Sequence, residues 1–112
     1  MSEARRVLIT RPEADASALA AELAGRGISS LCEPLLAIRY LDEAPLPDFN
    51  GCRGVLFTSA NGVRALARRL PRRDLPVFAV GEATGREAAA QGFADVRVAG
   101  GNVVRLAELV AD

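Results

Sequence analysis

Gly54-Val-Leu-Phe-Thr-Ser-Ala-Asn-Gly-Val63 is the stretch of the chain that decides the fold. Residues 55–57 form a short apolar run that is typical of a buried strand, and a helical pattern follows almost at once. Thr58 and Ser59 therefore stand where the strand ends and the helix begins. Ligands of open α/β sheets bind at the carboxyl ends of strands, where the free N–H groups of a helix N-terminus favour an anion.

The same arrangement is repeated at Val77-Phe-Ala-Val-Gly-Glu-Ala-Thr-Gly85. Further strands are predicted at residues 7–9, 29–33 and 96–98, and apolar residues recur at helical spacing in 16–23, 63–70 and 103–110. Each connecting helix is long enough for a right-handed parallel crossover. The predicted fold class is α/β: a three-layer α/β/α arrangement with a five-stranded parallel sheet in the flavodoxin-like order 2-1-3-4-5.

The length of 112 residues predicts one domain, residues 1–112, with a single core. Within it, residues 1–40 form a strand-helix-strand unit and residues 54–112 form three strand-helix units. Residues 41–53, which include Pro45 and Pro47 and show little periodicity, are predicted to be a linker or hinge loop.

Composition excludes several classes of function. The formal net charge is zero and there is no Trp, so neither nucleic acid nor a membrane is an expected partner. The chain has no histidine, and Cys32 and Cys52 are too few to build a metal site, so no metal is expected. Both cysteines are interpreted as reduced core or half-buried residues of a cytoplasmic protein.

Known nucleotide motifs are also missing. The chain contains neither G-x-G-x-x-G nor G-x-x-x-x-G-K-[ST], and its strands do not end in the carboxylates of a phospho-receiver domain. The predicted carboxyl edge carries neutral donors and one guanidinium, a set that suits a ligand bearing carboxylates. Taken singly, each Ser, Thr and Asn is equally explained as a helix cap. The candidate substrate-binding residues are Thr10, Arg11, Thr58, Ser59, Asn61, Gly81 and Thr84, with Asn102 as a further polar residue at a helix start.

A second candidate for anion binding is the basic cluster at residues 68–73. Because cations in the last turn of a helix are stabilising, it is interpreted as a solvated helix end.

Four motifs together resemble the N-terminal part of the uroporphyrinogen-III synthase family. They occur in a fixed order: Val7-Leu-Ile-Thr-Arg-Pro12, Glu33-Pro-Leu-Leu36, Gly54 to Val63, and Val80-Gly-Glu-Ala-Thr84. The resemblance implies a cofactor-free lyase that closes linear hydroxymethylbilane into uroporphyrinogen III with loss of water. Its substrate is a polycarboxylate tetrapyrrole, and Ser59 and Thr84 match the family's substrate-facing hydroxyl positions.

The chain also departs from that family. Family members are longer, with two α/β domains and a cleft between them, so the chain is interpreted as an excised N-terminal half. Tyr40 does not match the family's candidate acid, so no catalytic residue is assigned and little synthase activity is expected, with weak ligand binding at most. A closed monomer is favoured over a homodimer that exchanges its first units. The alternative function is a non-enzymatic flavodoxin-like scaffold; a flavin-binding relative is disfavoured because a phosphate loop is missing.

Overall fold

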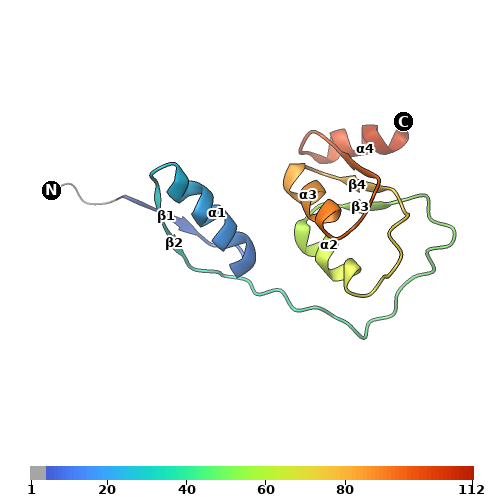
Figure 1. Cartoon of the computed structure of the whole chain (residues 1–112), viewed down its shortest axis with the longest axis horizontal. Helices are drawn as coiled ribbons and strands as arrows, with labels where there is room; N and C mark the ends of the chain where they lie inside the picture. The colour runs from blue at the N-terminus through green and yellow to red at the C-terminus, as the bar shows by residue number, and fades with distance from the viewer. Residues whose placement is uncertain (1–4) are drawn as a thin grey trace. The chain divides into compact units, whose positions relative to one another are not determined.

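The computed structural model describes residues 5–112, which form five parallel strands and four helices. The fold class, α/β with parallel strands, is as predicted, and each predicted strand is present within one or two residues. In chain order the elements are β1 (Arg6–Ile9), α1 (Glu13–Gly25), β2 (Ser29–Cys32), β3 (Val55–Phe57), α2 (Ala60–Ala67), β4 (Val77–Ala79), α3 (Glu82–Ala90), β5 (Val96–Val98) and α4 (Val103–Ala111) (Figure 1).

The strands form two sheets, of two and three strands, and not the single five-stranded sheet that was predicted. β1 pairs with β2, and β3, β4 and β5 pair in that order. The chain divides into two compact units, Met1–Arg39 and Tyr40–Asp112, called here the N-terminal and C-terminal units. Residues 33–54, which connect the two sheets, form irregular chain and contribute no strand or helix.

In the N-terminal unit, α1 covers one face of the β1–β2 ladder. Ile9 and Ala16 are its buried residues, and the Cys32 thiol lies 3.8 Å from the carbonyl oxygen of Ala16. Leu8 and Leu31 are opposite each other in the ladder and remain 59% and 39% exposed. Parallel sheets are normally covered on both faces. This small sheet therefore leaves one apolar face open within its own unit.

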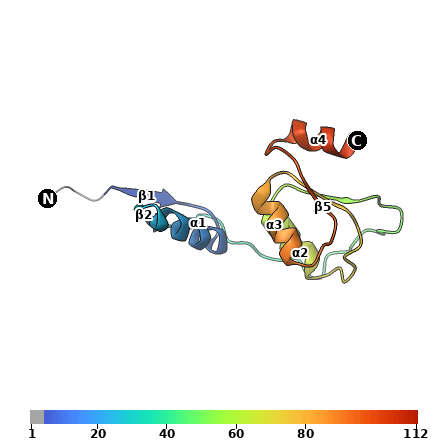
Figure 2. The same ribbon diagram turned by 45° about the horizontal axis from the view of Figure 1, so that its top comes forward.

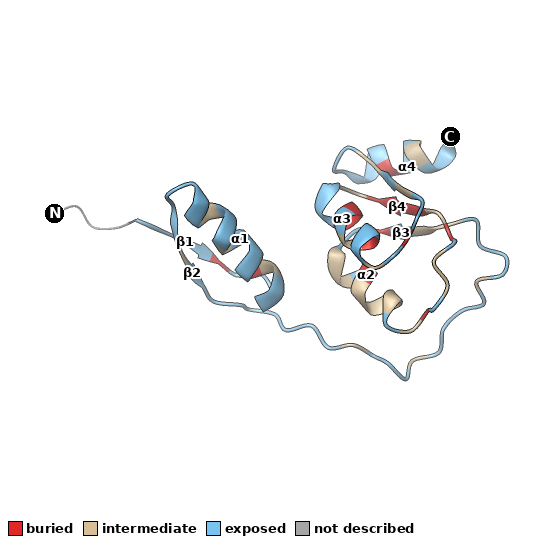
Figure 3. Ribbon diagram, viewed as in Figure 1, coloured by how far each residue is buried: buried red, intermediate tan, exposed pale blue. Residues whose placement is uncertain are grey.

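The C-terminal unit has helices on both faces of its sheet. α2 and α3 lie against one face, and α4 lies against the other (Figures 1 and 2). β4, the central strand, is buried at all three of its residues (Figure 3). The core contains Phe57, Val63, Val77, Ala88 and Phe93. The rings of Phe57 and Phe93 pack edge to face, with 6.3 Å between the ring centres.

Both cysteines are free thiols, as predicted, and both are exposed. The expectation that they would be buried or half-buried is wrong, because Cys32 stands on a strand with little cover and Cys52 lies in the irregular residues 33–54.

Gly85 allows α3 to approach the sheet closely. A Cβ built on Gly85 would lie 2.6 Å from Cγ2 of Val98, whereas a Cβ on Gly62 of α2 would meet its neighbours at 3.6 Å or more. The first spacing is a clash with a β-branched strand residue, and the second is ordinary van der Waals contact.

We expect Gly85→Ala to lower the free energy of unfolding of the C-terminal unit by about 1–3 kcal/mol, because the added methyl overpacks the helix–sheet interface. The matched variant Gly62→Ala should raise it by about 0.4–1 kcal/mol by reducing the entropy of the unfolded chain. Urea denaturation followed by circular dichroism measures both. Equal effects of the two substitutions would contradict the close packing of α3.

Candidate functional site

The helix N-termini of the C-terminal unit follow the carboxyl ends of its three parallel strands. The N-cap residues of α2, α3 and α4 are Ser59, Gly81 and Asn102. The turns before α3 and α4 adjoin, since the amide of Gly101 donates to the Val80 carbonyl at 2.8 Å. Three sets of first-turn N–H groups therefore start from one edge of one sheet, here called the carboxyl edge, which gives it a positive potential.

Two of the three helices are capped by a side chain. Ser59 Oγ accepts a hydrogen bond from the Gly62 amide at 3.2 Å, and Asn102 Oδ1 accepts one from Arg105 at 2.9 Å. Asn102 was predicted as an N-cap, and this is confirmed. Ser59 is exposed, so its hydroxyl hydrogen can still be donated to a ligand while its oxygen holds the cap.

The structure places Thr84 differently from Ser59. Thr84 lies in the first turn of α3 and is only 6% exposed. The Thr84 hydroxyl, which is predicted from the sequence to lie at the carboxyl edge, is therefore buried. Gly81, in contrast, makes no side-chain cap, so the first N–H groups of α3 depend on other partners.

Glu82 is a residue at this edge that the sequence analysis did not single out. It is exposed and lies in the first turn of α3, where a carboxylate is stabilised by the helix dipole. The same carboxylate repels an anionic ligand. The first turns of α2 and α4 contain no acidic residue, so these two N-termini are the better carboxylate sites.

Asn61 belongs to a polar network that joins α2 to α3. Arg64 donates to Asn61 Oδ1 at 3.0 Å and to Glu87 at 3.1 Å, and Gln91 donates to Glu87 at 3.0 Å. The side chains of Arg64 and Glu87 are only 25% and 22% exposed. Asn61 therefore takes part in fixing the two helices, a role that no local sequence signal indicates.

The candidate residues fall into two groups. Thr10 and Arg11 are exposed and follow β1 in the N-terminal unit, while the other five follow β3 and β4 in the C-terminal unit. The exposed Thr58 stands directly after β3, next to Ser59. Thr58, Ser59, Asn61, Gly81 and Thr84 thus share the C-terminal unit, with Thr84 buried, whereas Thr10 and Arg11 are described only with the N-terminal unit.

Arg68 and Arg69, the first two arginines of the basic cluster, bind the first residues of the loop that precedes β3. Arg68 binds both carboxylate oxygens of Asp42, at 2.6 and 3.2 Å, and its guanidinium lies 4.3 Å from the centre of the Tyr40 ring. Arg69 donates to the Leu41 carbonyl at 3.3 Å. We call these contacts the Tyr40–Asp42 clasp. The hydrogen bond from Arg68 holds the pKa of Asp42 below its ordinary value of 3.8.

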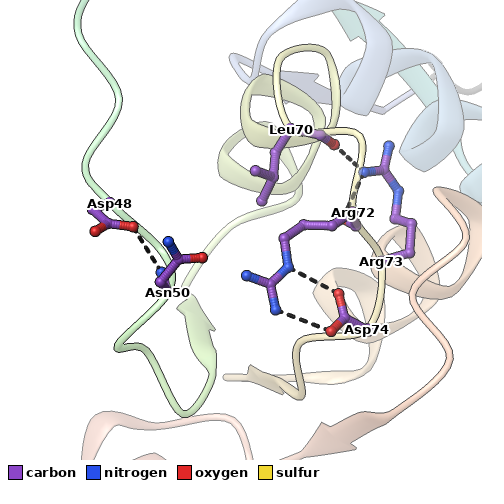
Figure 4. A network of polar contacts seen from close by, with 6 residues as sticks. All are labelled: Asp48, Asn50, Leu70, Arg72, Arg73 and Asp74. Carbon is purple, nitrogen blue, oxygen red and sulfur yellow. Dashed lines mark hydrogen bonds and ion pairs between the residues drawn. The ribbon is translucent and has the colours of Figure 1, made fainter.

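The second half of the cluster is satisfied in the same unit. Arg72 binds Asp74 through two hydrogen bonds of 2.9 and 3.0 Å and lowers the pKa of that carboxyl. Arg73 donates to the Leu70 carbonyl (Figure 4). It also donates to the main-chain carbonyl of Gln91. The four arginines of residues 68–73 thus have partners inside the chain, and the cluster is not an open phosphate site.

Two kinds of function have no support in the described part of the chain. Across residues 5–112, no set of three Cys, Asp or Glu side chains is placed to hold a metal ion. No helix of those residues is long and apolar enough to cross a membrane.

Comparison with known proteins tests the resemblance described above. The family model described as "Uroporphyrinogen-III synthase HemD" matches residues 17–112. The chain belongs to the uroporphyrinogen-III synthase family. A uroporphyrinogen-III synthase of Chlorobaculum parvum is 31% identical over 90 residues, covering 72% of this chain and 37% of that protein. The chain therefore aligns with little more than a third of this synthase's length.

The family match includes every candidate residue of the C-terminal unit. Thr10 and Arg11 precede the matched residues. The matched residues thus include the whole carboxyl edge of β3–β5.

Replacing Ser59 tests its structural role. We expect Ser59→Ala to lower the free energy of unfolding of the C-terminal unit by about 0.5–2 kcal/mol, because the first turn of α2 loses its cap. Ser59→Asp should keep most of that stability, since Asp caps as well as Ser. Thermal denaturation compares the two, and an equal loss in both would argue against a capping role.

The clasp predicts a change in the titration of Asp42. With Arg68 present, the pKa of Asp42 is lowered. The ion pair therefore contributes its full stability to the folded state when the pH is above 3.8, the ordinary pKa, and loses it as the pH falls through the lowered pKa. In Arg68→Ala the pKa of Asp42 should rise toward that ordinary value, measured by the carboxyl ¹³C shift. Arg72→Ala is the control, because it should move the pKa of Asp74 and leave Asp42 unchanged.

Proposed function

We propose that this chain binds carboxylate side arms of a tetrapyrrole at the carboxyl edge of β3–β5 and contributes that edge to a uroporphyrinogen-III synthase. The observation that carries the proposal is the convergence of three helix N-termini at one edge in a member of this family. Each carboxylate would accept hydrogen bonds from first-turn N–H groups and from the hydroxyls of Thr58 and Ser59.

The proposal extends to the way the sheet is completed. β1 and β3 are strands with an unpaired edge in the described chain, and joining them would give the order 2-1-3-4-5. In that sheet Thr10 and Arg11 would stand at the same edge as Thr58 and Ser59, because all strands are parallel. The guanidinium of Arg11 would then add a cation to a set of neutral donors.

Chemistry beyond binding is not supported by the residues of this chain. Tyr40 is the single tyrosine, and its ring is covered by Arg68 in the clasp. The carboxyls with a shifted pKa, Asp42 and Asp74, are shifted downward, whereas a general acid needs a raised pKa. We therefore propose that the chain serves as a binding part of the enzyme.

A titration with uroporphyrin tests the binding proposal. Absorbance and the amide shifts of residues 58–62 and 101–105 should change together. Ser59→Asp should weaken binding about tenfold, equivalent to ~1.4 kcal/mol, because it retains the cap and adds a like charge. Glu82→Gln should strengthen binding, because it removes a negative charge that repels the carboxylates of the ligand. Ala94→Asp carries the same charge change as Ser59→Asp at an exposed position beyond the C-terminal end of α3 and serves as the control.

The alternative function is a scaffold without a ligand, and specific observations favour it: Thr84 is buried and Ser59 already caps α2. Absence of any spectral change up to the solubility limit of uroporphyrin would support the scaffold.

We expect the 112-residue chain alone to produce no more type III isomer from hydroxymethylbilane than the uncatalysed reaction. One binding edge encloses the substrate on one side, so it stabilises the transition state little more than the bound substrate. Separation of the porphyrin isomers after oxidation measures the product. Clear turnover to the type III isomer would contradict this prediction.

A further inference from the structure

Arg64 links the neighbouring helices α2 and α3 through an ion pair that is largely shielded from water. Its Nε donates to Glu87 Oε1 at 3.1 Å, and Gln91 Nε2 donates to the same oxygen at 3.0 Å. The side chains of Arg64 and Glu87 are both mostly buried. The charge of Arg64 is therefore neutralised within the C-terminal unit, and the guanidinium is a poor attractor of an anion from solvent.

The same guanidinium sets the direction of the Asn61 side chain. Arg64 Nη1 donates to Asn61 Oδ1 at 3.0 Å. A guanidinium has donors and no acceptor, so it can bond only the oxygen end of an amide. The nitrogen end of Asn61, which has two N–H donors, is consequently the end that is turned away from Arg64.

The direction of this amide matters because of where Asn61 lies. It belongs to the first turn of α2, next to the N-cap Ser59, and this turn contains no acidic residue. A carboxylate only accepts hydrogen bonds. An amide that presents its nitrogen therefore suits a carboxylate at this turn, whereas an amide that presents its oxygen repels one.

We propose that Arg64 is a positioning residue of the carboxyl edge, which holds Asn61 as a hydrogen-bond donor for a carboxylate arm of the ligand. The inference rests on the proposed function and deepens it, because it names the group that determines the direction of a binding side chain. Arg64 acts through Asn61 and is itself held by Glu87, which in turn is held by Gln91.

Arg73 provides a matched comparison, since it is a second arginine that joins the same two helices. It donates to the carbonyls of Ala67, the last residue of α2, and of Gln91, the residue after α3. Its guanidinium also lies 5.0 Å from the centre of the Phe93 ring. These contacts are at the C-terminal ends of the helices. Arg73 therefore stabilises the helix pair without contacting the turn that holds Asn61.

Binding of uroporphyrin to the 112-residue chain and its variants tests the proposal. Arg64→Ala should weaken binding about tenfold, the loss expected for one hydrogen bond to a charged acceptor. Arg64→Lys keeps the charge and loses the planar fork, so it should weaken binding nearly as much. Arg73→Ala should lower the urea midpoint of unfolding at least as far as Arg64→Ala does, and leave binding unchanged. The unfolding curves show that each variant is folded where binding is measured.

Glu87→Gln tests the same network without removing the arginine. It should weaken binding, because Arg64 is held less firmly. An effect of net charge alone has the opposite sign, since the substitution removes a negative charge and should then strengthen binding.

A double-mutant cycle decides whether Arg64 acts through Asn61. Asn61→Ala alone should weaken binding about as much as Arg64→Ala, and the double variant should lose less than about twofold more. Independent effects of the two substitutions, full binding by Arg64→Lys, or equal losses of binding in Arg64→Ala and Arg73→Ala would overturn the proposal.

The unchanged chain separates failure of this inference from failure of the proposed function. If it binds uroporphyrin and Arg64→Ala binds equally well, only the positioning role is overturned. If the unchanged chain does not bind, the proposed function is overturned and the positioning role with it.

Discussion

Parallel strands are normally covered on both faces and are paired with neighbours along their edges, and the structure depends on this constraint. In the C-terminal unit β4 meets it fully, since it lies between two strands and between helices on either side. In the described residues, β1 and β3 do not meet it: each has a neighbouring strand along one edge, and the exposed side chains of Leu8 and Leu56 lie on uncovered faces of their sheets. The proposed pairing of β1 with β3 would give each of these two strands its second neighbour.

The same constraint explains why the candidate site is placed at the carboxyl edge. Parallel strands end at one edge, so the helices that follow them begin there and direct their unpaired N–H groups outward. Ser59 and Asn102 serve the fold as caps and remain in contact with solvent, while Glu82 adds a negative charge at the third helix. The edge is therefore uneven, and the N-termini of α2 and α4 offer a carboxylate more than that of α3 does.

The sequence predicted the local features well because they depend on neighbouring residues. The strands and helices follow from apolar periodicity, and the Asn102 cap follows from its position before a helical stripe. The burial of Thr84 was not predicted, because it depends on how α3 rotates against the sheet. The bonds between Arg68 and Asp42, 26 residues apart, have no local signal either. The loop was predicted from its prolines, but the clasp that shortens its free part became visible only in three dimensions.

The most direct test of this account is hydrogen exchange at the amides of Leu8 and Leu56, which point toward the open edges of β1 and β3. If these edges pair, both amides should exchange as slowly as those in the interior of the sheet, at least about a hundredfold more slowly than an unpaired amide. If both exchange at the rate of an exposed, unpaired amide while Val77 stays protected, the two sheets remain separate and the central claim is contradicted.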